Sequence, residues 1–153
     1  MSTSNGSAYI ESKVLTASQP QLHLILLEAA VRFGQRAAQL WGDASEELLR
    51  NDLLRRMMDV VEELTRSAAE GKTEISKQLE EQYAFVYREL AVCRFEDDEE
   101  KLASCLKLLE FQRETWKLAC ERLDQGVSPA AVTPSQHFQP AEQTVDSGFS
   151  LDA

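Results

Sequence analysis

The chain has 153 residues, of which 43% are hydrophobic and 27% charged, a balance typical of a soluble globular domain. Sixteen basic and twenty-six acidic side chains give a net charge of −10, which argues against binding to nucleic acid or to an anionic membrane surface. No apolar run approaches the ~20 residues that span a bilayer, and the first residues lack the basic start and apolar block of a signal peptide, so we expect a cytosolic protein.

Residues 1–17 are polar, with a few isolated apolar side chains such as Tyr9 and Val14. Four helices are then predicted, over residues 19–41, 45–70, 74–95 and 98–124. The first starts at a capping box, since Ser18 is followed three residues later by Gln21 and Pro20 falls in the first turn.

The other helices carry similar start and stop signals. Asp43, Thr73 and Asp97 are the predicted caps of the second, third and fourth helix. Glycine follows three of the four patterns, where a left-handed C-terminal cap is expected, at Gly42, Gly71 and Gly126.

The connections between these helices are very short, which forces neighbouring helices to run antiparallel. The sequence therefore predicts an all-α fold, an up-down four-helix bundle over residues 18–126. Residues 127–153 contain three of the four prolines and no Lys or Arg, and we expect this tail to be disordered.

The first helix carries more apolar side chains than one core-facing stripe requires. A turn of about 100° per residue sorts them into two stripes on roughly opposite sides. The larger is predicted to be the core seam: Leu22, Ile25, Leu26, Ala29, Phe33, Ala37 and Leu40. The second stripe, formed by Leu24, Leu27, Val31 and Ala38, is predicted to lie off the seam.

The third and fourth helices repeat this pattern. Phe85 and Val92 lie more than a quarter turn from the third helix's seam, which is Ile75, Leu79, Tyr83, Val86, Leu90 and Cys93. Phe111 and Leu118 point away from the fourth helix's seam, which is Leu102, Cys105, Leu106, Leu109, Trp116, Cys120 and Leu123. The second helix instead has one broad apolar face: Leu53, Leu54, Met57, Met58, Val60, Val61 and Leu64.

Single apolar side chains on a surface are normal, and the amino-terminal segment could fold over one stripe. Pairs at helical spacing on several helices favour a groove that accepts another apolar helix. Burying five such side chains is worth on the order of 10 kcal/mol before the costs of association. A binding protein is thus the favoured interpretation.

The sequence lacks the spacings of histidine, cysteine and acidic residues that are typical of catalytic and metal sites. His23 and His137 are the only histidines, and neither belongs to the Glu-x-x-His motif of di-iron bundles. Cys93, Cys105 and Cys120 lack the short spacings of a zinc site and are predicted to be buried free thiols. We therefore expect no enzyme activity, no metal and no cofactor.

A histidine phosphotransfer domain remains an alternative for a four-helix bundle, with His23 as the phosphorylated residue. Leu24 to Leu27 follow that histidine, and such an apolar neighbourhood is poor for a phosphate.

The sequence resembles the flagellin-specific export chaperone family, FliS, from about Tyr9 to about Arg122. The amino-terminal signature is carried by Tyr9, Val14 and Thr16-Ala17-Ser18 before a Leu-rich helix. Tyr83, Arg88 and Leu90 match the family's third helix, and Arg113, Glu114 and Trp116 match its carboxy-terminal Arg-Glu-x-Trp. The chain departs from the family pattern at Gln19, Leu27, Ala29, Phe85, Cys93 and Arg94.

The resemblance implies a cytosolic chaperone that binds the disordered carboxy-terminal segment of flagellin, prevents its premature polymerisation, and delivers it to the flagellar type III export gate. It also implies that the amino-terminal segment takes part in client binding. We expect a monomer that binds its client one to one, with a bundle adaptor for another amphipathic helix as the alternative. The predicted client contacts are Tyr9, Val14, Leu24, Leu27, Val31, Phe85, Val92, Phe111 and Leu118.

Overall fold

A computed structural model describes residues 18–126 of the chain. Its elements are α2 (Gln19–Gln39), the short 3-10 helix η1 (Ala44–Glu46), α3 (Glu47–Ala69), α4 (Glu74–Glu96) and α5 (Glu99–Asp124). The predicted helices are confirmed, each to within two residues at its ends. None of the helices in the described range is long and apolar enough to cross a membrane.

The helix starts follow from side-chain caps. Ser18 and Gln21 form the predicted capping box before α2, and Thr73 accepts a hydrogen bond from the Ser76 amide at the start of α4. Asp43 caps η1 rather than α3 directly, because one 3-10 turn intervenes between the two. Each cap pairs a backbone N–H that the first helical turn leaves without a partner.

The predictions for Asp97 and Gly71 are wrong. Asp98, not Asp97, caps α5, while Asp97 ends α4 in the left-handed conformation at φ 58°. Gly42 and Gly126 have the expected positive φ, but Gly71 does not. A Cβ at Gly71 would lie 2.1 Å from the Ser76 hydroxyl oxygen, so glycine is needed there because the first turn of α4 approaches closely.

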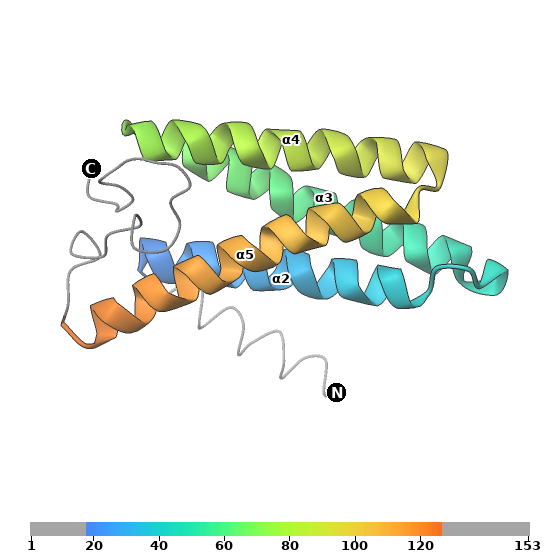
Figure 1. Cartoon of the computed structure of the whole chain (residues 1–153), viewed down its shortest axis with the longest axis horizontal. Helices are drawn as coiled ribbons and strands as arrows, with labels where there is room; N and C mark the ends of the chain where they lie inside the picture. The colour runs from blue at the N-terminus through green and yellow to red at the C-terminus, as the bar shows by residue number, and fades with distance from the viewer. Residues whose placement is uncertain (1–17, 127–153) are drawn as a thin grey trace.

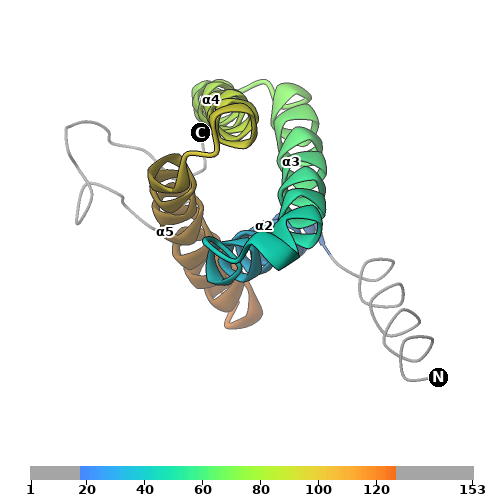
Figure 2. The same cartoon turned by 90° about the vertical axis from the view of Figure 1, so that its right-hand side faces the viewer.

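The four helices pack antiparallel in a ring in which each contacts the next, as predicted (Figures 1 and 2). The contact between α4 and α5 is the least extensive of the four. Figure 1 shows why: α5 meets α4 at their connecting turn and then runs diagonally across to α2. The α4–α5 pair is therefore the side on which the ring is least tightly closed.

A clamp at one end of the bundle joins three connections. The Arg50 guanidinium lies 4.3 Å from the centroid of the Trp41 ring and donates a 2.7 Å hydrogen bond to Asp97. Its Nε is buried without a hydrogen-bond partner in the described part of the chain. The end of α2, the start of α3 and the α4–α5 turn thus meet at one side chain.

The core confirms the predicted seams of three helices. The largest fully buried side chains are Tyr83, Leu27, Leu54, Met57, Leu64, Leu90, Leu102 and Leu109, with Val31, Val61, Val86 and Cys93. The broad face of α3 lies almost wholly inside, as expected. Of the residues assigned to the α5 seam, Leu123 departs from the prediction, since it is 37% exposed at the end of the helix.

The predicted face of α2 is wrong. Leu27 and Val31, assigned to the outer stripe, are 0% and 1% exposed. The buried stripe is His23, Leu27, Ala30, Val31, Gly34 and Ala37. Most of the predicted seam, namely Leu22, Ile25, Leu26, Ala29, Phe33 and Leu40, is only partly buried, and Ala37 alone is fully inside.

Close packing explains why the buried face of α2 is rotated from the predicted one. A Cβ on Gly34 would lie 2.8 Å from Leu106 Cδ2 and 2.8 Å from Met57 Cε. Small residues at the contact let α2 approach α3 and α5 closely, so the face that carries Ala30, Gly34 and Ala37 is the buried one.

Candidate partner-binding surface

Three large apolar side chains are exposed on α4 and α5. Phe85 is 48% exposed, Phe111 53% and Leu118 54%. The sequence pattern predicted that all three would lie off the core seam, and the burial confirms that geometry. Their contact with a partner stays a prediction.

Polar contacts mark the line along which α4 and α5 meet. Lys101 Nζ lies 3.1 Å from Glu89 Oε1, and the Gln112 side-chain amide donates to the Gln82 side-chain oxygen. The Cys105 thiol lies 4.0 Å from the Val86 carbonyl oxygen. These pairs set the register of the two helices.

The register places Phe85 and Phe111 near one another along this line. Phe85 follows Gln82 by three residues and Phe111 precedes Gln112 by one. At about 100° per residue, each phenylalanine is rotated from the contact line in the direction away from the core, so it lies on the outer side of its helix. We call these three exposed side chains on the outer sides of α4 and α5, namely Phe85, Phe111 and Leu118, the outer apolar surface.

The remaining predicted contacts divide into three groups. Leu24 and Val92 are partly buried and keep some accessible surface. Leu27 and Val31 lie in the core and present no surface to a client, so the prediction that they lie on the outer stripe is corrected. Tyr9 and Val14 lie outside the described residues.

The sequence reasoning missed two kinds of surface residue. Leu48 and Phe95 are 86% and 90% exposed, and the helical turn angle, which places each opposite the buried stripe of its helix, could have found them. The strip of α2 that was assigned to the core seam is only partly buried: Leu22, Ile25, Leu26, Ala29 and Phe33. Leu26 and Phe33 pack against the core from its edge.

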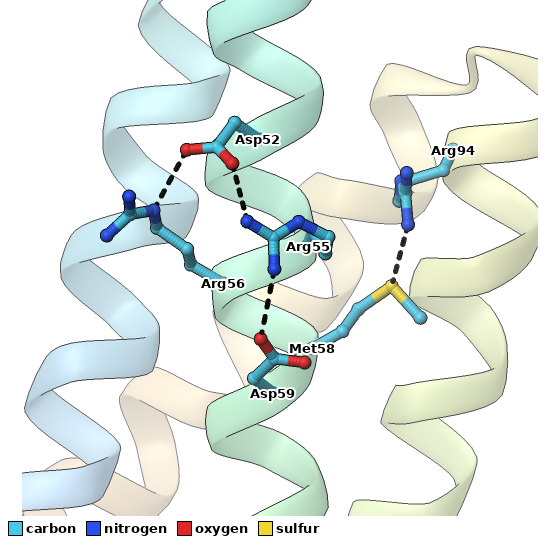
Figure 3. A network of polar contacts seen from close by, with 6 residues as sticks. All are labelled: Asp52, Arg55, Arg56, Met58, Asp59 and Arg94. Carbon is cyan, nitrogen blue, oxygen red and sulfur yellow. Dashed lines mark hydrogen bonds and ion pairs between the residues drawn. The ribbon is translucent and has the colours of Figure 1, made fainter.

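Beyond Leu48 in its first turn, the outer side of α3 is charged. Figure 3 shows Asp52 bonded to Arg55 at 2.7 Å and to Arg56 at 2.9 Å, with Asp59 within 3.4 Å of Arg55. Hydrogen bonds from these arginines lower the pKa of Asp52. A shallow depression between α3 and α4 is likewise polar, lined by Glu62, Thr65, Arg66, Ala84, Tyr87 and Arg88. An apolar client segment is better matched by the α4–α5 side.

A buried aromatic cluster joins α2, α4 and α5. His23 Nε2 lies 2.7 Å from the Tyr83 hydroxyl, and the His23 ring stacks on Trp116 with centroids 4.1 Å apart. Burial lowers the pKa of His23 from 6.5 to about 4 and raises that of Tyr83. An imidazole that is buried and whose Nε2 is bonded to Tyr83 is unsuited to accept a phosphoryl group, which weakens the phosphotransfer alternative.

The three cysteines are buried free thiols, as predicted. Burial raises the pKa of Cys93 to about 11 and that of Cys105 to about 12, and it also raises the pKa of Cys120. Thiols of this kind are poor nucleophiles because the thiolate is the reactive form.

The fold and this surface are those of a four-helix bundle that exposes large apolar side chains on two adjoining helices. The profile of the family described as Flagellar protein FliS matches residues 1–123. The chain therefore belongs to the FliS family, whose members are non-catalytic chaperones of the cytoplasm, and membership implies a role in flagellin export. No curated protein matches the chain.

Proposed function

We propose that the chain binds the carboxy-terminal segment of flagellin on the outer apolar surface of α4 and α5, as a monomer and one to one. It keeps the bound segment from polymerising early and delivers it to the flagellar export gate. Family membership supports the flagellin partner. The observation that carries the choice of surface is the exposure of Phe85, Phe111 and Leu118 on adjoining helices.

The size of this surface requires further contacts. Full burial of one such side chain is worth ~1.5–3 kcal/mol, so covering the exposed halves of three contributes about 3 kcal/mol. Ordering a disordered client costs ~2–5 kcal/mol. The client must therefore cover more apolar surface than this patch.

Two further sources of contact are available. One is the partly exposed strip on α2, which includes Ile25 and Phe33. The other is the amino-terminal segment with Tyr9 and Val14, which we propose as a lid that takes part in client binding. Val92, seven residues after Phe85 on α4, and Leu24 on α2 are partly buried and complete the proposed contact set.

The chain offers a matched pair of variants to test the surface. Phe85→Asp and Phe95→Asp place the same charge on the same helix, at side chains that are 48% and 90% exposed. We expect Phe85→Asp to weaken binding of a synthetic flagellin carboxy-terminal segment at least tenfold in calorimetry, and Phe95→Asp to leave it unchanged. Far-UV circular dichroism should show both variants fully helical.

Equal loss of affinity in both variants would mean that charge alone weakens the complex. No loss of affinity in either variant would indicate that the client binds another face of the bundle. The partly exposed strip on α2 would then be the first candidate. A full chain that binds other amphipathic helices as tightly as the flagellin segment would favour the adaptor alternative.

A further inference from the structure

The outer face of α5 has basic side chains at both ends of its apolar stripe. Lys107 lies one turn before Phe111, and Arg122 lies one turn after Leu118. At about 100° per residue, these four positions share an arc of roughly 60° on the helix surface. In a protein with a net charge of −10, an apolar stripe flanked by cations is unusual.

These cations are not neutralised by ion pairs within the described residues. Neither Lys107 nor Arg122 makes a salt bridge there, and the nearest acidic side chains lie beside the stripe rather than on it. Glu114 lies about 20° outside this arc, between Phe111 and Leu118, and is paired with Arg113 at 3.4 Å; Glu121 lies about 40° outside the arc. The stripe can therefore accept a segment that is both apolar and acidic.

Residues 127–153 have that composition. They contain Glu142, Asp146 and Asp152 but no Lys or Arg, and they include the apolar side chains Val127, Val132, Phe138, Val145, Phe149 and Leu151. The family match ends at residue 123, so this segment lies outside what the family shares.

The segment begins where it can reach the stripe. Gly126 has a φ of 79°, which turns the chain at the end of α5. Phe111 lies fifteen residues back along the helix, about 22 Å at 1.5 Å per residue. Phe138 follows Gly126 by twelve residues, about 37 Å in an extended proline-rich chain at ~3.1 Å per residue.

We propose that residues 127–153 fold back along α5 and dock on the stripe from Lys107 to Arg122, with Phe138 against Leu118 and Phe111 and the acidic residues near the two cations. The tether supplies an effective concentration on the order of millimolar, so weak contacts suffice. If the proposed client surface is correct, the tail also competes with the client. The docking itself does not depend on that function.

Site-specific photo-cross-linking in the client-free full chain tests this. A photoreactive p-benzoylphenylalanine replaces Phe111 in one protein and Phe95 in the control, since both are exposed phenylalanines but only Phe111 lies on the stripe. Trypsin releases residues 123–153 as one peptide because it contains no Lys or Arg. We expect mass spectrometry to join this peptide to residues 108–113, with at least five times the yield found at position 95.

In the double variant Lys107→Glu, Arg122→Glu, trypsin releases residues 102–113 and 118–153 instead, and the yield of the cross-link between these two peptides should be at least threefold lower. Lys77→Glu on the exposed side of α4 should leave the yield at position 111 unchanged. Equal yields at positions 111 and 95 would overturn the proposal. So would a cross-link from position 111 to residues 1–17, or one that joins two copies of the chain. Because no client is present, these outcomes are independent of whether flagellin binds.

Discussion

The His23 imidazole Nε2 lies 2.7 Å from the Tyr83 hydroxyl, so one buried hydrogen bond joins α2 to α4 across 60 residues of chain. Trp116 of α5 stacks on the same imidazole. Three of the four helices therefore meet at a side chain that is neutral only while the pH stays well above its pKa.

Stability should fall on acidification between about pH 6.5 and pH 4. Burial lowers the pKa of His23 from 6.5 to about 4, so in this range the unfolded chain binds a proton that the folded chain does not. The free energy of unfolding then decreases as the pH falls, by up to about 3 kcal/mol, since one pKa unit is worth ~1.4 kcal/mol. Urea titrations at a series of pH values measure this decrease.

His23→Gln is the control, because an amide can still bond to Tyr83 but does not titrate. This variant should lose the decrease between about pH 6.5 and pH 4 and keep the loss at lower pH. The latter comes from carboxylates such as Asp52, whose lowered pKa stabilises the folded state until the group is protonated. An unchanged slope in His23→Gln would assign the whole effect to the carboxylates.

The buried face of α2 predicts a clear contrast between two aliphatic residues of this helix, Leu27 and Ile25. Leu27→Ala should lower the free energy of unfolding by about 3 kcal/mol, because it leaves a cavity at a side chain that is 0% exposed. Ile25→Ala should cost less than about 1 kcal/mol, since Ile25 is only partly buried. Chemical denaturation of both variants tests whether the face with Leu27 or the face with Ile25 is the buried one. Equal losses in the free energy of unfolding would contradict the packing of α2.

Local signals in the sequence were enough to predict the helices and their antiparallel order. Ser18, Thr73 and the left-handed Gly42 and Gly126 act within a turn of the residues that they cap, so their effect is visible in the sequence. The outward position of Phe85, Phe111 and Leu118 also followed from the helical turn angle alone. These features need no knowledge of the neighbouring helices.

The face of α2 could not be predicted in this way because it depends on the neighbours. Apolar side chains surround much of this helix, and their bulk favours Leu22, Ile25 and Phe33 as the core. The close approach at Gly34 selects a face rotated from this one by roughly 100°, and that approach is fixed by Met57 and Leu106 on other helices. The bond between His23 and Tyr83 is likewise invisible to any local pattern.

Gly34 itself gives a test of this close approach. An added Cβ would meet only the flexible ends of Met57 and Leu106, and alanine gains ~1 kcal/mol of helix propensity over glycine. Gly34→Ala should therefore change the free energy of unfolding by less than about 1 kcal/mol, whereas Gly34→Val should cost at least ~2 kcal/mol through overpacking. Thermal and urea unfolding of the pair measure the difference, and a harmless valine would mean that α2 is not closely packed here.

The clamp formed by Arg50, Trp41 and Asp97 predicts unequal effects for substitutions of its two charged residues. Arg50 is buried against Trp41, so Arg50→Ala should cost about 2 kcal/mol through the lost cation–π contact and packing. The Asp97 side chain is 62% exposed, and Asp97→Asn keeps a residue that tolerates the left-handed conformation, so it should cost less than ~1 kcal/mol. Asp97→Val should cost more than Asp97→Asn because a β-branched residue is strained at φ 58°.

Denaturant titration of the three variants measures these differences in the free energy of unfolding. Should Asp97→Asn prove as damaging as Arg50→Ala, the ion pair rather than the Trp41 contact would dominate the clamp.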